Sequence, residues 1–263
     1  MQRSVGGRRS AAPAPGLPDP KVKGPFRPFT CDPDWSEAWW WLGVPLAVAL
    51  FVVASYQIAP EWNIRYVTEE SGILETAQFI LMVMALALAV QLLFDPFVRR
   101  RPFVLAFTVV AALACLFIGG EEVSWGQHIF YWQEPDLVTA VNNEGELSLH
   151  NMNKGFERAP RTVLEFAVML GGLLIPALCA YFPRWRQSRI ALFLPASALI
   201  PTAAFAVLFK AFGTLGKYQD TGFGVAGPSE ATEFYLYFFI FAYLIIFERR
   251  INALRKDEAK GKA

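Results

Sequence analysis

The residues best suited to chemistry are two adjacent glutamates, Glu121 and Glu122, which follow directly on an apolar run. The run 103–118 rises only about 24 Å as a helix, less than the roughly 30 Å of hydrocarbon in a bilayer. The helix must therefore continue, or the chain must turn inside the membrane. In both cases the pair lies at or below the membrane edge, where carboxylates are costly and usually have a function.

The pair also occupies an unfavourable place on its helix. With the N-terminus in the cytoplasm, this third span runs outward, so the pair lies near its C-terminal end, where the helix dipole disfavours anions. Two neighbouring carboxylates there need a cation, a metal ion, a hydrogen-bond network or protonation. Lys210 and Arg161 are the expected cationic partners. The structural alternative to a functional site is an ion-pair network that joins the third and fifth spans.

One block of candidate residues continues from this pair. If the helix extends through it, Glu121, Ser124 and His128 lie on one face, three and four residues apart. Ser124 is then a candidate nucleophile with His128 as its base, although a serine in a helix more often bonds to its own backbone. Gln127 adds a further donor and acceptor to the same block.

A second block, GELSLHN at 145–151, lies in a long connection. Glu146 and His150 are four residues apart, so one helical turn would direct both side chains at one ion. The alternative is that His150 is a hydrogen-bonding anchor at the membrane surface. The chain has 2 histidines, which excludes a three-histidine zinc site within one chain. Carboxylates would therefore hold most of any metal ion, as in Mg, Mn or Fe sites or a Zn site with mixed ligands.

Further acidic residues open the second, fourth and sixth spans, at the same end of the protein as Glu122. Carboxylates at similar depth in separate helices can converge on a metal ion in a bundle. The structural alternative is stabilisation of helix N-termini, and Thr162-x-x-Glu165 fits a capping box. These acidic residues are Glu69, Glu70, Glu75, Glu165, Glu230 and Glu233.

Composition places the chain among membrane proteins. Hydrophobic residues make up 54% of it, with 23 Phe and 8 Trp, and the mean hydropathy is +0.33. Several apolar stretches approach the spanning length and lack the period-2 alternation of barrel strands, so we expect an all-α polytopic protein with about six transmembrane helices. The predicted spans are 39–59, 72–94, 103–120, 162–182, 190–212 and 231–248.

The flanking segments predict the topology. Residues 1–37 are polar, basic and rich in proline, without the apolar core of a signal peptide, and we expect a disordered cytoplasmic tail. Most of the 24 Lys and Arg residues then fall on the cytoplasmic side, including the basic tail 251–263. The transmembrane domain is predicted over 38–250, with both termini cytoplasmic and a long, aromatic outer loop at 120–161.

The two blocks carry a resemblance. GEEVSWGQ at 120–127 followed by GELSLHN at 145–151 resembles a pattern in a group of uncharacterised bacterial multi-pass membrane proteins. The resemblance extends over about residues 60–250 and implies the bacterial inner membrane, with the candidate site on its outer, periplasmic face. It brings no known activity. A looser similarity, through Ser124-x-x-x-His128, is to membrane ceramidase-type metal hydrolases, which rely on more histidines than this chain has.

The first functional hypothesis is a metal-dependent membrane enzyme that acts on a lipid or polyprenyl-type substrate. One divalent ion would bind to carboxylates of the spans together with the second block, and Glu121 would be the general base on a metal-bound water. Ser124, Gln127 and Asn151 would orient the substrate. The predicted metal ligands are Glu122, Glu146, His150 and Glu233.

Two hypotheses from other classes remain open. Acidic residues at membrane depth also suit a proton- or cation-coupled transporter, although carrier sites usually lie nearer the midplane. A non-catalytic scaffold or assembly protein would instead use the aromatic outer loop 120–161 to bind a protein partner. Membrane lipids are the other expected partners, and no nucleic-acid signature is present.

Overall fold

The structure is a computed structural model that describes residues 35–68, 72–126, 154–182, 185, 189–219 and 228–260. Within these ranges the chain forms helices and turns and no strand. Six helical segments are long and apolar enough to cross a membrane, which confirms the predicted all-α, multi-pass architecture. These segments are Trp39–Ile58, Pro60–Leu93, Pro102–Glu122, Pro160–Tyr181, Ile190–Leu215 and Pro228–Ala259.

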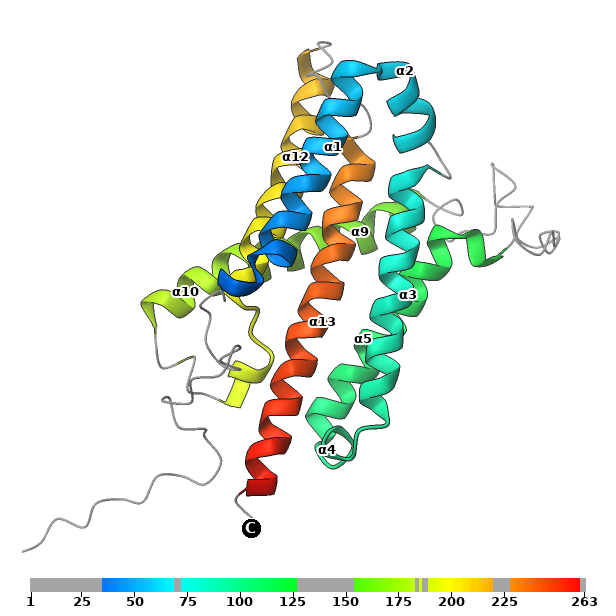
Figure 1. Ribbon diagram of the computed structural model, residues 1–263. Coiled ribbons are helices and arrows are strands. Elements are labelled where there is room, and N and C mark those ends of the chain that lie inside the picture. The colour runs from blue at the N-terminus through cyan, green and yellow to red at the C-terminus, as the bar shows by residue number, and fades with distance from the viewer. Residues whose placement is uncertain are drawn as a thin grey trace, which may run out of the picture.

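Each span is built from one or more helical elements (Figure 1). The first three spans contain a π-helical turn (Trp39–Gly43), α1 (Val44–Ile58), α2 (Pro60–Asn63), a second π-helical turn (Ile64–Thr68), α3 (Ile73–Leu93) and α5 (Pro102–Glu122). The fourth contains α9 (Lys154–Met169), a π-helical turn (Leu170–Leu174) and α10 (Ile175–Tyr181). The last two contain 3-10 turns (Arg189–Leu192, Ser197–Leu199), α12 (Ile200–Gln219) and α13 (Pro228–Lys260).

The second and third spans form the antiparallel hairpin that their short connection predicts. Asp95 caps the single-turn helix α4 (Pro96–Arg99), because its Oδ1 accepts a 2.7 Å hydrogen bond from the backbone N–H of Phe97. Pro96 and Pro102 each lie at the start of a helix, where the missing N–H costs no intrahelical bond. The chain therefore reverses within a few residues, and α3 packs along α5.

Helix α13 is the central element of the bundle. Two thirds of its most apolar stretch, 67%, is buried inside the protein, against 22% for the first span. It packs against both α3 and α12, and the buried Tyr235 hydroxyl donates a 3.0 Å hydrogen bond to the carbonyl of Pro45 near the start of α1. The other spans consequently surround α13 and direct much of their surface to lipid.

The fourth span is interrupted and runs obliquely across the other helices in Figure 1. Its π-helical turn contains Gly171 and Gly172, both buried. A Cβ on Gly172 would lie 2.8 Å from the ring of Phe239 and against the Cβ of Ala203. Glycine thus allows this span to pass in direct contact with α12 and α13.

The fifth span begins at Ile190 as predicted, and both the fifth and the sixth spans extend beyond their predicted ends. Pro195 interrupts the start of the fifth, so its regular α-helix covers Ile200–Gln219. The turn before it is held by Arg250 of α13, which is 2% exposed and donates to the carbonyls of Ala191 (3.2 Å) and Leu192 (3.0 Å). Helix α13 extends through Lys260, so most of the predicted basic tail is helical.

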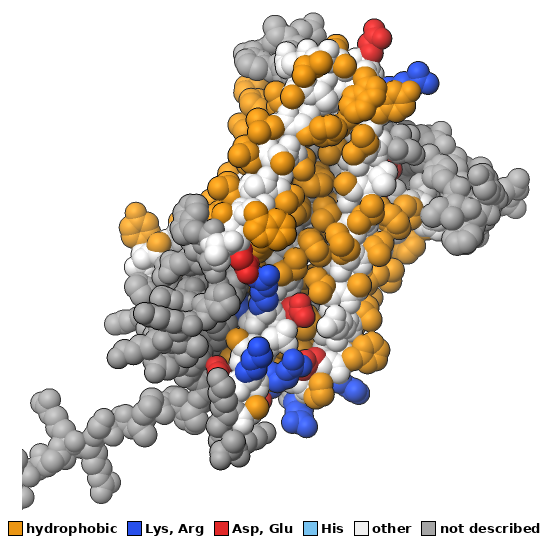
Figure 2. All heavy atoms as spheres, viewed as in Figure 1, with side chains coloured by type: hydrophobic (Ala, Val, Ile, Leu, Met, Phe, Trp, Pro, Cys, Tyr) orange, Lys and Arg blue, Asp and Glu red, His pale blue; other side chains and the backbone are white. Residues whose placement is uncertain are grey.

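Charged side chains gather at the end of the bundle where the C-terminus lies, below a broad hydrophobic face (Figure 2). Ion pairs there join different elements: Arg255 to Asp95 at 2.8 Å, and Arg101 to Glu258. The surface thus has an apolar face that ends at a charged region, which is the distribution expected of a protein that spans a bilayer. The assignment of this end to the cytoplasm remains a prediction.

We predict that Gly172→Ala destabilises the protein. The added methyl would overlap Ala203 and Phe239, and overpacking of this kind costs about 1–3 kcal/mol. Gly43→Ala is the matched control, since its Cβ would meet only the carbonyl oxygen of Ala38 at an ordinary 3.7 Å. Thermal unfolding of the detergent-purified variants should show a lower Tm for Gly172→Ala alone. Equal Tm values would contradict the close helix contact.

Candidate functional site

Five carboxylates from four helices gather around the start of α13; we call them the acidic cluster. Glu122 interacts electrostatically with Glu75 and Glu230. Glu233 interacts in the same way with Glu122 and Glu165. The chain thus brings together acids that lie up to about 150 residues apart in sequence. The members are Glu75 on α3, Glu122 on α5, Glu165 on α9, and Glu230 and Glu233 on α13.

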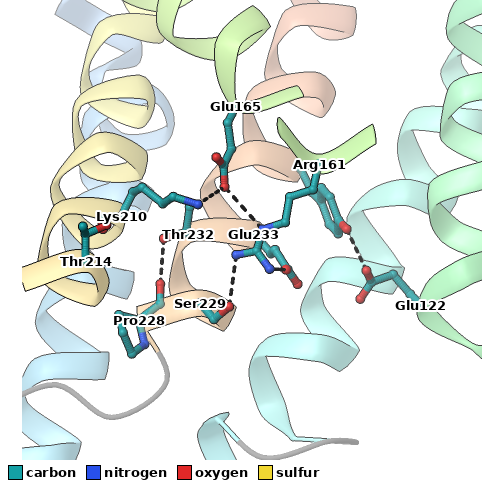
Figure 3. A network of polar contacts seen from close by, with 10 residues as sticks. Glu122, Arg161, Glu165, Lys210, Thr214, Pro228, Ser229, Thr232 and Glu233 are labelled. Atoms are coloured by element: carbon teal, nitrogen blue, oxygen red, sulfur yellow. Dashed lines mark hydrogen bonds and ion pairs between the residues drawn. The ribbon is translucent and has the colours of Figure 1, made fainter. Parts of the chain in front are cut away.

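Arg161 of α9 connects the cluster (Figure 3). It forms an ion pair with Glu233, its Nε lies 3.3 Å from Oε1 of Glu165, and its Nη2 donates a 3.0 Å hydrogen bond to the hydroxyl of Ser229. Nζ of Lys210, on α12, lies 2.7 Å from the same Glu165 oxygen. Three helices are therefore joined through one chain of charges.

Glu122 has a different direct partner from the cations expected for it. The hydroxyl of Tyr237, a buried residue of α13, donates a 2.7 Å hydrogen bond to Oε1 of Glu122. Arg161 acts on Glu122 only through the longer-range electrostatic interaction, and Lys210 pairs with Glu165. The unfavourable position of Glu122 at the C-terminal end of α5 is thus compensated partly by a neutral hydrogen bond between α5 and α13.

A buried glutamine adjoins the cluster. Gln78, three residues after Glu75 on α3, is fully buried, and its Nε2 donates a 2.9 Å hydrogen bond to the backbone carbonyl of Glu230. Among the described residues its Oε1 has no hydrogen-bond partner. A buried amide oxygen in that state favours a donor or a cation beside it.

The third span stops at Glu122 instead of continuing. Ser124, Trp125 and Gly126 have φ values of 44°, 52° and 82°, which is left-handed backbone that ends a helix. The condition for placing Glu121, Ser124 and His128 on one helical face is therefore not met, and Ser124 is buried. The helix therefore does not continue through 120–126, and the remainder of the segment, 127–132, lies outside the described residues.

Several residues of the GEEVSWG block have a structural role in this turn. The Trp125 ring folds back on α5, and its Nε1 donates a 2.6 Å hydrogen bond to Oε1 of Glu121. A Cβ on Gly120 would come within 2.9 Å of that ring, so glycine leaves the space the indole occupies. The ring also meets Phe117 edge to face, with 6.3 Å between centroids. Glu121 therefore has a structural partner besides any catalytic role.

The capping-box interpretation of Thr162 and Glu165 is wrong. Helix α9 begins at Lys154, well before the predicted start at 162, so Thr162 lies inside the helix and is not an N-cap. Glu165 accepts from Arg161 and Lys210 and is part of the acidic cluster. The pattern was misleading because the polar residues before 162 continue the helix.

Several predicted site residues lie outside the residues that the structure describes. These are Gln127, Glu146, His150 and Asn151, together with Glu69, Glu70 and His128. Of the four predicted metal ligands, Glu122 and Glu233 are described, and both belong to the acidic cluster. In the described part of the chain no group of three or more His, Cys, Asp or Glu residues has a geometry that could hold a metal ion. The predicted metal site is untested by these coordinates.

Sequence reasoning missed Tyr237, Gln78 and Ser229. A signal for the first two was present, because Tyr237 follows Glu233 by four residues and Gln78 follows Glu75 by three, which is the spacing of one helix face. Ser229 had no such signal. Its contact with Arg161 depends on how α9 crosses the start of α13.

The described part of the acidic cluster contains more carboxylates than cations. Among the described residues, two cations, Arg161 and Lys210, pair with two of the five carboxylates, Glu165 and Glu233. The pair Arg161–Glu233 is partly buried, with side chains 29% and 17% exposed. Ionised groups at such depth require compensation. The remaining negative charge therefore calls for protons, for a further cation, or for groups from the outer loop.

We predict a non-additive effect at the Arg161–Glu233 pair. Arg161→Gln should cost about 2 kcal/mol of unfolding free energy, between the values for exposed and buried pairs, because it leaves Glu233 without its cation and Glu165 with Lys210 alone. Adding Glu233→Gln should restore part of the loss. Arg255→Gln, which breaks an exposed pair, is the control and should cost less than about 1 kcal/mol. Strictly additive losses in denaturation experiments would contradict the pairing.

Comparison with known proteins gives no further identification: no family model, no curated protein and no solved structure matches this chain.

Proposed function

We propose that this chain is a multi-pass membrane enzyme that binds a divalent cation in its acidic cluster and acts on a lipid or polyprenyl-type substrate. The observation that supports the proposal most is the excess of carboxylates over cations among the described residues of a partly buried site built from four helices. A purely structural ion-pair network would be expected to balance its charges more closely, since unpaired charges at this depth destabilise the fold.

Four residues would hold the ion. Glu122 and Glu233 would supply carboxylate oxygens from α5 and α13, and Glu146 and His150 of the outer loop would complete the ligand set. An oxygen-rich set of this kind suits Mg, Mn or Fe, or Zn with mixed ligands. When bound, the ion would acidify a water molecule. Glu121 would accept the proton of that water.

The surroundings of the cluster support an amphiphilic substrate. A cavity of about 180 Å³ lies between α9, α12 and α13 and reaches Glu165 and Lys210 at its polar end. The rest of its lining is mostly apolar, and Phe166, Met169 and Val207 are 56%, 37% and 40% exposed on the lipid-facing side. A hydrocarbon chain can enter such a groove laterally from the bilayer while its polar group approaches the charges.

Elemental analysis of the detergent-purified protein tests the proposal. We expect about one divalent ion per chain in the wild type and at least a tenfold weaker retention in Glu122→Gln and Glu233→Gln, because each removes one charged ligand. Glu61→Gln, at an exposed acid outside the cluster, is the control. A wild-type protein without bound metal after purification in metal-containing buffer would refute the metal-dependent mechanism.

A second candidate function is a proton- or cation-coupled transporter. The observation that favours it is the interrupted fourth span: Pro160 lies inside α9, just before Arg161, and the π-helical turn Leu170–Leu174 follows the end of α9. Such interruptions often mark sites of helix movement.

Proteoliposomes distinguish the two functions. A transporter predicts a proton or cation flux across the membrane that falls strongly in Glu122→Gln but not in Glu61→Gln. The enzyme predicts no flux above protein-free vesicles. A flux that is independent of Glu122 would contradict the coupling role of the acidic cluster.

A further inference from the structure

A second groove lies apart from the acidic cluster, where the segment Pro60–Thr68 meets the start of α3. It encloses about 590 Å³ and is open to the surroundings. Helix α3 alone has 21 residues, enough to span a bilayer, so the preceding segment extends beyond the span toward the membrane surface. Figure 1 shows α2 at the end of the bundle opposite the C-terminus. The groove-lining residues used below are Trp62, Arg65, Tyr66, Ile73, Thr76 and Ile80.

Arg65 supplies a positive charge to this groove. Its guanidinium lies 5.4 Å from the centroid of the exposed Tyr66 ring, and no ion pair joins it to a carboxylate among the described residues. It differs in this from Arg101, Arg161, Arg249 and Arg255, each of which pairs with an acid. An exposed guanidinium at a membrane surface binds phosphate groups well, because its planar donors match two phosphate oxygens.

The remaining lining changes from amphipathic to apolar along the groove. Trp62 and Tyr66 are 43% and 47% exposed, with ring centroids 6.0 Å apart, and such aromatic pairs favour the level of lipid head groups. Below them Ile73 and Ile80, 47% and 50% exposed, continue the groove along α3 for about 10 Å. Along the groove, the charge of Arg65 is therefore followed by the aromatic pair Trp62 and Tyr66. The stretch from Ile73 to Ile80, the apolar channel, comes next.

We propose that this groove binds one anionic phospholipid, with its phosphate on Arg65, its head group between Trp62 and Tyr66, and an acyl chain along Ile73 and Ile80. The order of the lining matches the order of chemical groups in a phospholipid. Charge complementarity favours an anionic head group, since Arg65 is the charged residue among the described residues that line the groove. A soluble anion would use Arg65 but leave the apolar channel empty.

Native mass spectrometry of the detergent-purified full chain tests this assignment, with phosphatidylglycerol and phosphatidylcholine as probes. Wild type should retain one phosphatidylglycerol in preference to phosphatidylcholine. Arg65→Gln should weaken the retention of phosphatidylglycerol about fivefold, the effect of one basic residue near an anionic surface, and leave phosphatidylcholine unchanged. Arg100→Gln, at an exposed arginine on the opposite end of the bundle, is the matched control and should behave as wild type.

A second pair of variants tests the apolar part of the groove. Thr76 is exposed and lines the groove, so Thr76→Trp should fill it and reduce the retention of both lipids. Val90→Trp, about 21 Å further along α3, adds the same side chain outside the groove and should have no effect. Elution volume and far-UV circular dichroism identify folded variants.

Three results would overturn the proposal. One is an equal loss of phosphatidylglycerol in folded Arg65→Gln and Arg100→Gln, which would indicate general electrostatic attraction. Another is unchanged lipid retention in folded Thr76→Trp. The third is displacement of the bound lipid by excess inorganic phosphate, which would mean that Arg65 binds a free anion and that the apolar channel contributes nothing.

Discussion

The arrangement of this bundle depends on how negative charge is compensated in a medium of low dielectric constant. Arg161 lies where α9 crosses the start of α13, and its contacts with Glu233, Glu165 and Ser229 join these two helices. Lys210 extends the same network to α12. Because each charge is expensive without its partners, the relative position of three spans is fixed by the requirement that these groups stay together.

The central helix α13 contributes residues both to the core of the bundle and to the acidic cluster. Successive faces of α13 carry Glu233 and Tyr237 toward the acidic cluster and the buried Tyr235 toward the carbonyl of Pro45. One turn further on, Phe239 packs against the glycines of the fourth span. A shift of α13 that opened the cluster would therefore also disturb the closest helix contact of the bundle. The site and the core thus depend on the position of the same helix.

The sequence was sufficient for the spans, the α3–α5 hairpin and the expectation that acids of separate helices share one end, because hydropathy and loop length determine these features. It was insufficient for the end of the third span. That end depends on the Trp125 ring packing over Gly120, a tertiary contact that periodicity does not contain. The partners of Glu165 were missed because the capping pattern assumed a helix start at Thr162. Helix α9 begins at Lys154 instead, and Glu165 accepts from Arg161 of the same helix and from Lys210 of α12.

The two ways of neutralising the acidic cluster would have different mechanical consequences. A proton on Glu122 would remove repulsion from Glu75 and Glu230 but add no connection between helices. A divalent ion shared by Glu122 and Glu233 would neutralise both and also add a direct tie between α5 and α13, which are otherwise joined there through the Tyr237 hydroxyl. Metal binding should therefore strengthen the contact of the α3–α5 hairpin with α13, whereas protonation should only reduce the repulsion between the carboxylates. Under the proposed function, occupancy of the metal site would therefore stabilise the pair of helices α5 and α13.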